Sequence, residues 1–214
     1  MPRFPFFAGS ALLSVLLLAG CAQQPLTSID RSKYKTVALD PDIKAPAHYV
    51  YRDITGKRSR GMFGGLIGLM IGAASEGPGF QRFNAAASKN PIDIRAVVRR
   101  HVEEALRTSK LLSLAQTDAD TTLKIEILAY GVGPVHGREL GGIVAARVTL
   151  TGRGGALIWK KDEWATSNTT TLLENLEANP ALWPRMASEA AEALAKKLIL
   201  VSSTTQRTAP QPLM

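Results

Sequence analysis

An apolar run near the amino terminus limits how much of this 214-residue chain can enter a folded domain. Arg3 is the only charged residue before Asp30, and the segment from Phe6 to Gly20 is uncharged, mostly apolar and dense in leucine. A short positive stretch followed by a brief apolar stretch is typical of a secretory signal peptide. A transmembrane helix needs about 20 apolar residues, more than this segment offers. The sequence therefore predicts that residues 1–20 are a cleaved signal peptide.

The apolar run ends at the only cysteine of the chain, in the order Leu18-Ala19-Gly20-Cys21. This tetrapeptide resembles the lipobox of bacterial lipoproteins, in which the signal is cut before the cysteine and the cysteine is acylated. The resemblance implies a mature chain that begins at Cys21 and is held by membrane lipid, since several acyl chains together anchor a protein stably. No aspartate follows the cysteine, which implies the outer membrane and a domain facing the periplasm. The alternative is an ordinary signal peptide with a chance cysteine.

The amino-acid composition limits which classes of molecule this protein is expected to bind. Lys and Arg total 26 against 18 Asp and Glu, a net charge of +8, and 45% of the residues are hydrophobic, enough for a packed core. A single cysteine excludes an internal disulfide framework and a cysteine-rich zinc site. Such a charge is typical of proteins that meet nucleic acid or an anionic surface. An exported, lipid-anchored chain does not normally meet nucleic acid, so we expect anionic headgroups or an unidentified envelope protein instead.

The chain divides into four predicted segments. These are the signal peptide (1–20), the lipidated cysteine with a polar tether (21–33), a periplasmic domain (34–201) with a glycine-rich insert at 57–80, and a disordered tail (202–214) rich in Ser, Thr, Gln and Pro.

Periodicity predicts the elements of the central domain. Leu123, Ile125 and Ile127 alternate with charged residues, as in a half-buried strand, whereas apolar residues after position 93 recur at helical spacing. We expect strands at 34–39, 48–54 and 121–130, a hairpin over 144–164 that turns at 152–155, a helix opened by Asn90-Pro91 and ending near Ser109, a glycine-rich loop at 131–142, and a last helix over 183–201. This order predicts an α+β fold, a mainly antiparallel sheet with helices on one face.

The stretch from Ile92 to Trp159 carries a second resemblance. A helix ending Glu104-Ala105-Leu106-Arg107-Thr108-Ser109 is followed by Asp118-Ala119-Asp120, then by a strand and a hairpin with glycine at its turn. This order is similar to the small periplasmic domains of the curli-secretion lipoprotein, the penicillin-binding-protein activators and the amino-terminal domain of the Tol propeller protein. The similarity covers about half of the chain and bears on fold more than on function.

Residues 61–75 have no charge and a regular pattern of glycine. Glycines recur every four residues in two series, Gly61 with Gly65, and Gly64 with Gly68 and Gly72. On a helix they would line one face and allow close packing of a second backbone, as in membrane helices. The run spans about 22 Å as a helix, short of a roughly 30 Å hydrocarbon core. A membrane-inserting or self-associating segment and a mobile glycine-rich loop are both open.

Three basic residues stand directly before this glycine-rich run. Lys57, Arg58 and Arg60 form a cluster that suits anionic lipid headgroups. The other interpretation is a solvated run of charges.

Motifs for catalysis are missing from the sequence. His48, His101 and His136 lack metal-ligand spacing, and His101 with Glu104 is only half of a helical metal site, more typical of a surface pair. There is no dinucleotide fingerprint, phosphate loop or nucleophile elbow. We therefore expect no enzymatic activity, no cofactor and no metal. Of the three tryptophans, we expect two in the core and Trp164 on a sheet edge where a partner would bind.

Together these features favour a lipid-anchored envelope protein that serves as a non-enzymatic interaction or assembly module. The alternative is an oligomeric, membrane-inserting or secretion-type component that works through residues 61–75.

Overall fold

The computed structural model describes residues 33–52, 77–109 and 112–199. In this part of the chain the strands are β1 (Thr36–Leu39), β2 (Val50–Tyr51), β3 (Ser113–Leu114), β4 (Thr121–His136), β5 (Glu139–Gly152) and β6 (Leu157–Thr171). The helices are α2 (Pro78–Ala87), α3 (Ile94–Thr108), α4 (Leu173–Ala178) and α5 (Leu182–Ile199), with a single 3-10 turn, η2 (Arg153–Gly155).

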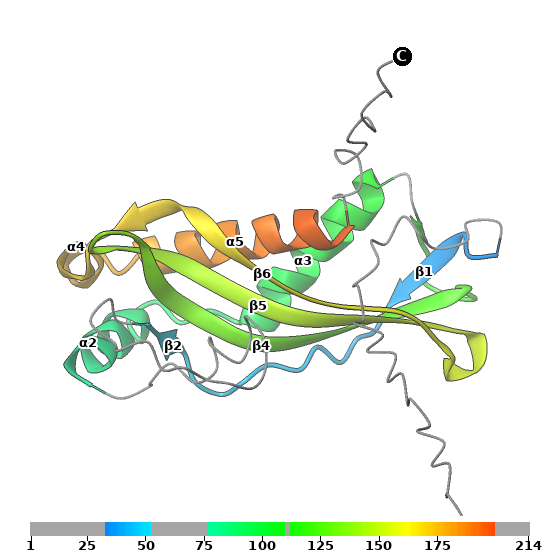
Figure 1. Cartoon of the computed structure of the whole chain (residues 1–214), viewed down its shortest axis with the longest axis horizontal. Helices are drawn as coiled ribbons and strands as arrows, with labels where there is room; N and C mark the ends of the chain where they lie inside the picture. The colour runs from blue at the N-terminus through cyan, green and yellow to red at the C-terminus, as the bar shows by residue number, and fades with distance from the viewer. Residues whose placement is uncertain (1–32, 53–76, 110–111, 200–214) are drawn as a thin grey trace, which may run out of the picture.

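The strands form one mixed sheet, with helices α3 and α5 across one of its faces (Figure 1). Its order is β3-β1-β4-β5-β6, and β2 pairs with β4 off this path. The long strands β4, β5 and β6 are antiparallel, whereas β1 runs parallel to β3 and β4, and β2 runs parallel to β4. The fold is therefore α+β, as the sequence predicted, with short parallel strands added to an antiparallel centre.

The core lies between the sheet and the two long helices. Between the bulges of the long strands every second residue faces the helices, and Leu123, Ile125 and Val148 are at most 2% exposed. At one end, Tyr49, Phe83, Tyr130 and Trp183 form edge-to-face pairs with ring centroids 5.2–5.6 Å apart. Such aromatic pairs stabilise a core beyond the area they bury. This cluster joins α2, α5, β4 and the segment before β2.

Helix α3 begins later than predicted. Asn90-Pro91 does not open it; Asp93 is the cap, and its carboxylate accepts a hydrogen bond from the Arg95 N–H at 3.1 Å. An aspartate at the cap satisfies a free backbone donor and suits the positive end of the helix. The predicted end at Ser109 is confirmed.

The loop predicted over residues 131–142 is wrong. Strand β4 continues to His136 and β5 starts at Glu139, so the two strands are joined by a tight turn at Gly137 and Arg138. The glycines stand where another backbone comes close. A Cβ atom on Gly131 would lie 1.8 Å from the Val50 carbonyl oxygen, and one on Gly142 would lie 2.6 Å from the Met186 carbonyl oxygen.

Other observed element boundaries differ from the predicted ones by fewer residues. Strand β6 continues to Thr171, beyond the predicted end near Trp164, and only Val50–Tyr51 of the predicted strand 48–54 is a strand among the described residues. Helix α2 begins at Pro78, inside the range assigned to the insert, and neither α2 nor α4 was predicted. The turn at 152–155 is confirmed, and the last helix is confirmed over Leu182–Ile199, where Glu192 and Lys196 form an ion pair one turn apart.

Candidate functional site

The predicted site residues lie outside the described residues. This holds for the lipobox and its acylation site (Leu18, Ala19, Gly20, Cys21), for the glycine series (Gly61, Gly64, Gly65, Gly68, Gly72) and for the basic cluster (Lys57, Arg58, Arg60). Two other places in the described part of the chain gather polar or aromatic side chains. They are the face of the sheet opposite α3 and α5, here called the helix-free face, and the seam between α3 and α5.

A row of charged residues crosses the helix-free face. The register places Glu126 of β4 beside Arg147 of β5, and Arg147 beside Asp162 of β6. The Arg147 guanidinium donates from Nε and Nη2 to the two Asp162 carboxylate oxygens, each at 2.9 Å, and its Nη1 lies 3.8 Å from Glu126 Oε2. The hydrogen bond to Asp162 is the main cause that raises the pKa of Arg147. Two-pronged pairs of this kind fix the strands' register as well as adding energy.

A small apolar cluster follows this row on the helix-free face. Ala129 and Ala145 are buried, with Val50, Ile143 and Trp164 half-buried against them, separate from the main core. The Lys197 ammonium lies 5.4 Å from the centroid of the Trp164 ring and donates to the Trp164 carbonyl oxygen at 3.0 Å. Trp164 therefore lies on the edge strand of the sheet, whereas Trp159 and Trp183 are buried in the core.

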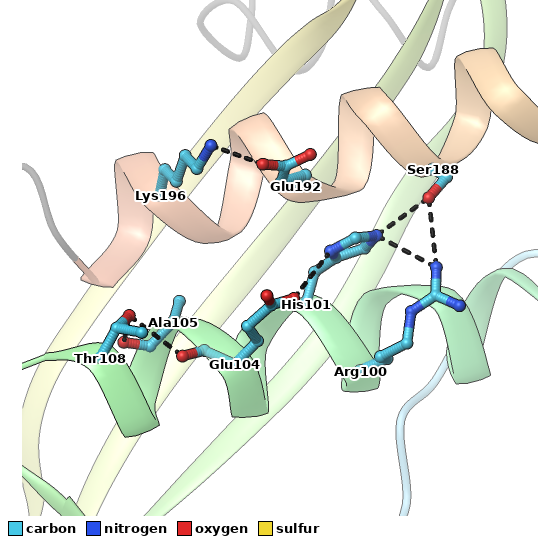
Figure 2. A network of polar contacts seen from close by, with 8 residues as sticks. All are labelled: Arg100, His101, Glu104, Ala105, Thr108, Ser188, Glu192 and Lys196. Atoms are coloured by element: carbon cyan, nitrogen blue, oxygen red, sulfur yellow. Dashed lines mark hydrogen bonds and ion pairs between the residues drawn. The ribbon is translucent and has the colours of Figure 1, made fainter.

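A polar network fills the seam between α3 and α5 (Figure 2). His101 Nε2 lies 2.9 Å from the Ser188 hydroxyl, and the Arg100 guanidinium donates to the same hydroxyl at 3.2 Å. His101 Nδ1 is 3.8 Å from a Glu104 carboxylate oxygen and has no hydrogen bond within the described part of the chain. The His101 side chain is only 11% exposed, whereas Glu104 is 70% exposed.

Burial sets the protonation state of His101. Desolvation is the main cause that lowers its pKa, and the charge of Arg100 adds to it. The ring is therefore neutral at pH 7, held by Ser188 between the helices. The expected surface pair with Glu104 is thus half right, because the carboxylate is at the surface and the imidazole is buried.

Two kinds of feature are absent from the described residues, a membrane-spanning helix and a metal-binding cluster. Among these residues no helix combines the length and the apolar character that a membrane crossing needs. They also contain no group of three or more His, Cys, Asp or Glu side chains placed to hold a metal ion.

Sequence reasoning did not single out Arg147, Asp162 or Ser188. The alternation of β5 already put Arg147 on the face opposite Val148, and that signal could have placed it on the helix-free face. The pairing with Asp162 depends on the register after the turn, and the contact with Ser188 depends on how two helices pack.

Comparisons with known proteins show similar solved structures only. No family model matches the chain, and no curated protein matches it. A putative lipoprotein from Caulobacter crescentus is 14% identical, with a TM-score of 0.36, covering 51% of this chain and 80% of that one. A protein from Xanthomonas campestris is 10% identical, with a TM-score of 0.42, covering 82% and 89%. The PelC dodecamer from Paraburkholderia phytofirmans is 13% identical, with a TM-score of 0.38, covering 78% and 86%.

Bacterial lipoproteins and a dodecamer are thus among the structures that resemble this chain. The low identities and TM-scores do not establish membership of any of their families. The resemblance to the curli-secretion, penicillin-binding-protein-activator and Tol classes stays a prediction.

Proposed function

We propose that this chain is a lipid-anchored envelope protein that serves as a non-enzymatic interaction or assembly module at the periplasmic face of the outer membrane. One observation carries the proposal. The only cysteine of the chain, Cys21, directly follows Leu18-Ala19-Gly20 at the end of a short, leucine-rich, uncharged run. An acylated cysteine there would hold the folded domain beside the membrane, with residues 22–33 between lipid and domain.

The character of the folded part suits an interaction module better than an active site. Its best-formed polar clusters are made of contacts within the fold: Arg147 is held by Asp162, and His101 by Ser188. Both clusters connect separate elements of the fold, so they stabilise the arrangement of strands and helices. A protein of this kind works through its surface and through where it is anchored.

The experiment changes the anchor alone. We expect Cys21→Ala to move the chain from the membrane pellet to the soluble periplasmic fraction and to abolish labelling by a clickable fatty acid. The matched control is Ala22→Ser, next to the acylation site, which keeps both the label and the membrane location. Density-gradient separation of the control then assigns inner or outer membrane. A Cys21→Ala chain that stays in the membrane pellet contradicts lipid anchoring.

The glycine series supports a second candidate function, an oligomeric membrane-inserting or secretion-type component. Gly64, Gly68 and Gly72 repeat every four residues within an uncharged stretch, a pattern that brings helices into close contact in membranes. This candidate expects a detergent-stable oligomer that is lost when the three glycines become leucine. It is excluded if the wild-type and the triple variant are both monomers in detergent.

A further inference from the structure

The long edge strand β6 leaves a short piece of its backbone unpaired. Within the described residues, β5 is its only strand neighbour, so its other side is an edge of the sheet (Figure 1). Edge strands present free N–H and C=O groups to other chains, and proteins usually block them. Whether another chain can pair with β6 therefore depends on which of its outward N–H and C=O groups are already blocked.

Trp164 shows which residues of β6 direct their backbone outward. Its N–H donates to the Glu163 carboxylate at 3.1 Å, and its carbonyl oxygen accepts from Lys197 at 3.0 Å. Its backbone therefore points away from β5. The ladder between β5 and β6 is regular from Trp159 to Thr166, so every second residue points the same way, which includes Lys160 and Asp162.

The open stretch of this edge has two clear ends. On one side the register shifts between Leu157 and Trp159, and on the other side the backbone of Trp164 is capped by side chains. Between these ends, the outward backbone groups of Lys160 and Asp162 have no hydrogen-bond partner among the described residues. The free edge is therefore a segment centred on Lys161.

We propose that a second copy of this chain pairs with this segment, antiparallel and about a two-fold axis at Lys161. In that register Lys160 of one copy lies directly opposite Asp162 of the other, and the reverse. Each of these residues then donates its N–H to, and accepts with its carbonyl from, its opposite number. The sheets of the two copies continue into each other, and the interface is closed because both sides use the same residues.

Charge complementarity favours a second copy of this chain as the partner of β6. In this register the side chains of Lys160 and Asp162, both on the helix-free face, lie opposite each other twice, once in each direction, which gives two attractive pairs. Lys161 lies on the two-fold axis, directly opposite Lys161 of the second copy. Its ammonium is neutralised within the chain by Glu163, at 3.0 Å.

This pairing deepens the proposed assembly role, and its test does not depend on lipidation. The full chain carrying Cys21→Ser has no thiol, so a single new cysteine reports contacts alone. Residues facing each other at the axis are a non-hydrogen-bonded pair about 4.5 Å apart between Cα atoms, within the range of a disulfide. Lys161→Cys in this background is therefore expected to give a reducible dimer on mild oxidation with copper–phenanthroline.

Lys160→Cys is the matched control for geometry. In the proposed register two cysteines at that position would be about 8–9 Å apart between Cα atoms, beyond the roughly 7 Å limit for a disulfide. Dimers from Lys161→Cys and none from Lys160→Cys support the pairing. No dimer from Lys161→Cys, or equal yields from both, overturns it and leaves the charges of β6 as a guard against edge pairing.

Sedimentation of the same cysteine-free chain tests the charge argument. Lys160→Glu turns both attractive pairs into repulsive ones and is expected to raise the dimer dissociation constant about tenfold. Lys124→Glu changes the net charge equally on β4, away from the edge, and is expected to leave it unchanged. Equal effects of the two variants would show that net charge, and not the β6 register, governs association.

Discussion

Gly142 permits helix α5 to pack directly on β5, and replacing it tests how tightly the two are fitted. A Cβ atom at this position would lie 2.6 Å from the Met186 carbonyl oxygen, 2.7 Å from its carbonyl carbon and 3.1 Å from its Cβ. Ordinary contact starts at 3.4 Å, so the strand and helix must separate by about 0.8 Å. The clash is with the backbone of α5, and the buried face of this helix forms much of the core. A side-chain rotation cannot relieve the clash, and a shift of the helix would disturb the packing of the core.

We therefore expect Gly142→Ala to destabilise the domain by about 2 kcal/mol, in the range of overpacked cores. For a domain of this size that lowers Tm by roughly 4–8 °C. The measurement is equilibrium urea unfolding followed by tryptophan fluorescence, because Trp159 and Trp183 are buried and report loss of the core. Adding Met186→Ala is not expected to restore stability, since the clashing oxygen and carbon belong to the backbone.

The neighbouring glycine gives a matched control. A Cβ on Gly141 would lie 2.6 Å from Val135 Cγ2, the end of an exposed side chain that can turn away. Alanine also restricts the unfolded chain, which stabilises by about 0.4–1 kcal/mol where the backbone conformation allows it. We expect Gly141→Ala to stay within about 0.5 kcal/mol of wild type. Equal losses from both variants, or no loss from Gly142→Ala, would refute the close-packing argument.

Two further predictions concern titrating groups. The lowered pKa of His101 means that the unfolded chain binds a proton more readily than the folded one, so stability is complete above about pH 6.5 and falls as the pH drops below it, by at most about 1.4 kcal/mol per pH unit. Urea unfolding between pH 8 and pH 5 should show this slope in wild type and not in His101→Gln, which keeps a polar group near Ser188; an unchanged slope would show that other groups cause it. Asp120 accepts hydrogen bonds from the backbone N–H groups of Lys35 and Thr36 and from the Thr36 hydroxyl, and the Lys35 bond is the largest cause that lowers its pKa. Asp120→Ala should therefore lower Tm at neutral pH, with a difference from wild type that shrinks as the pH falls below about 3.8, whereas a constant difference would exclude this carboxylate as the cause.

Local patterns predicted much of the fold because they record which face of an element is buried. Leu123, Ile125 and Ile127 alternate with polar residues, and all three are at most 2% exposed against the helices. The start of α3 was misplaced because Asn90 and Asp93 are both good caps, and the choice depends on where the chain leaves α2. The short strands β1, β2 and β3 pair in parallel, and such pairing depends on contacts distant in sequence.

The site was harder to predict because its contacts join elements that are far apart in sequence. His101 was identified from its spacing to Glu104, yet its closest polar partner is Ser188, on a different helix. Arg147 and Asp162 are fifteen residues apart, and a shift of one residue in the hairpin would put them on opposite faces. The residues predicted for membrane attachment depend on local sequence alone, which is why they could be proposed without any knowledge of the fold.

The glycines of β4 and β5 show how a loop and a closely packed strand can be told apart. Gly131 and Gly133 occupy alternate positions, and the residues between and before them, Tyr130 and Val132, are buried and apolar. The alternation of β4 shifts by one residue at the bulge between Ile127 and Ala129 and then resumes at Tyr130 and Val132, through the glycines, whereas a surface loop has no reason to resume it. In such a pattern glycine marks the side on which a neighbour comes close: the β2 backbone at Gly131 and the Ile143 side chain at Gly133. The glycines of residues 61–75 recur every four positions instead, which would place each series along one face of a helix, and the loop interpretation of that run stays open. The two runs thus share a composition, and it is the alternating apolar residues between the glycines, not the number of glycines, that indicate a strand at 130–133.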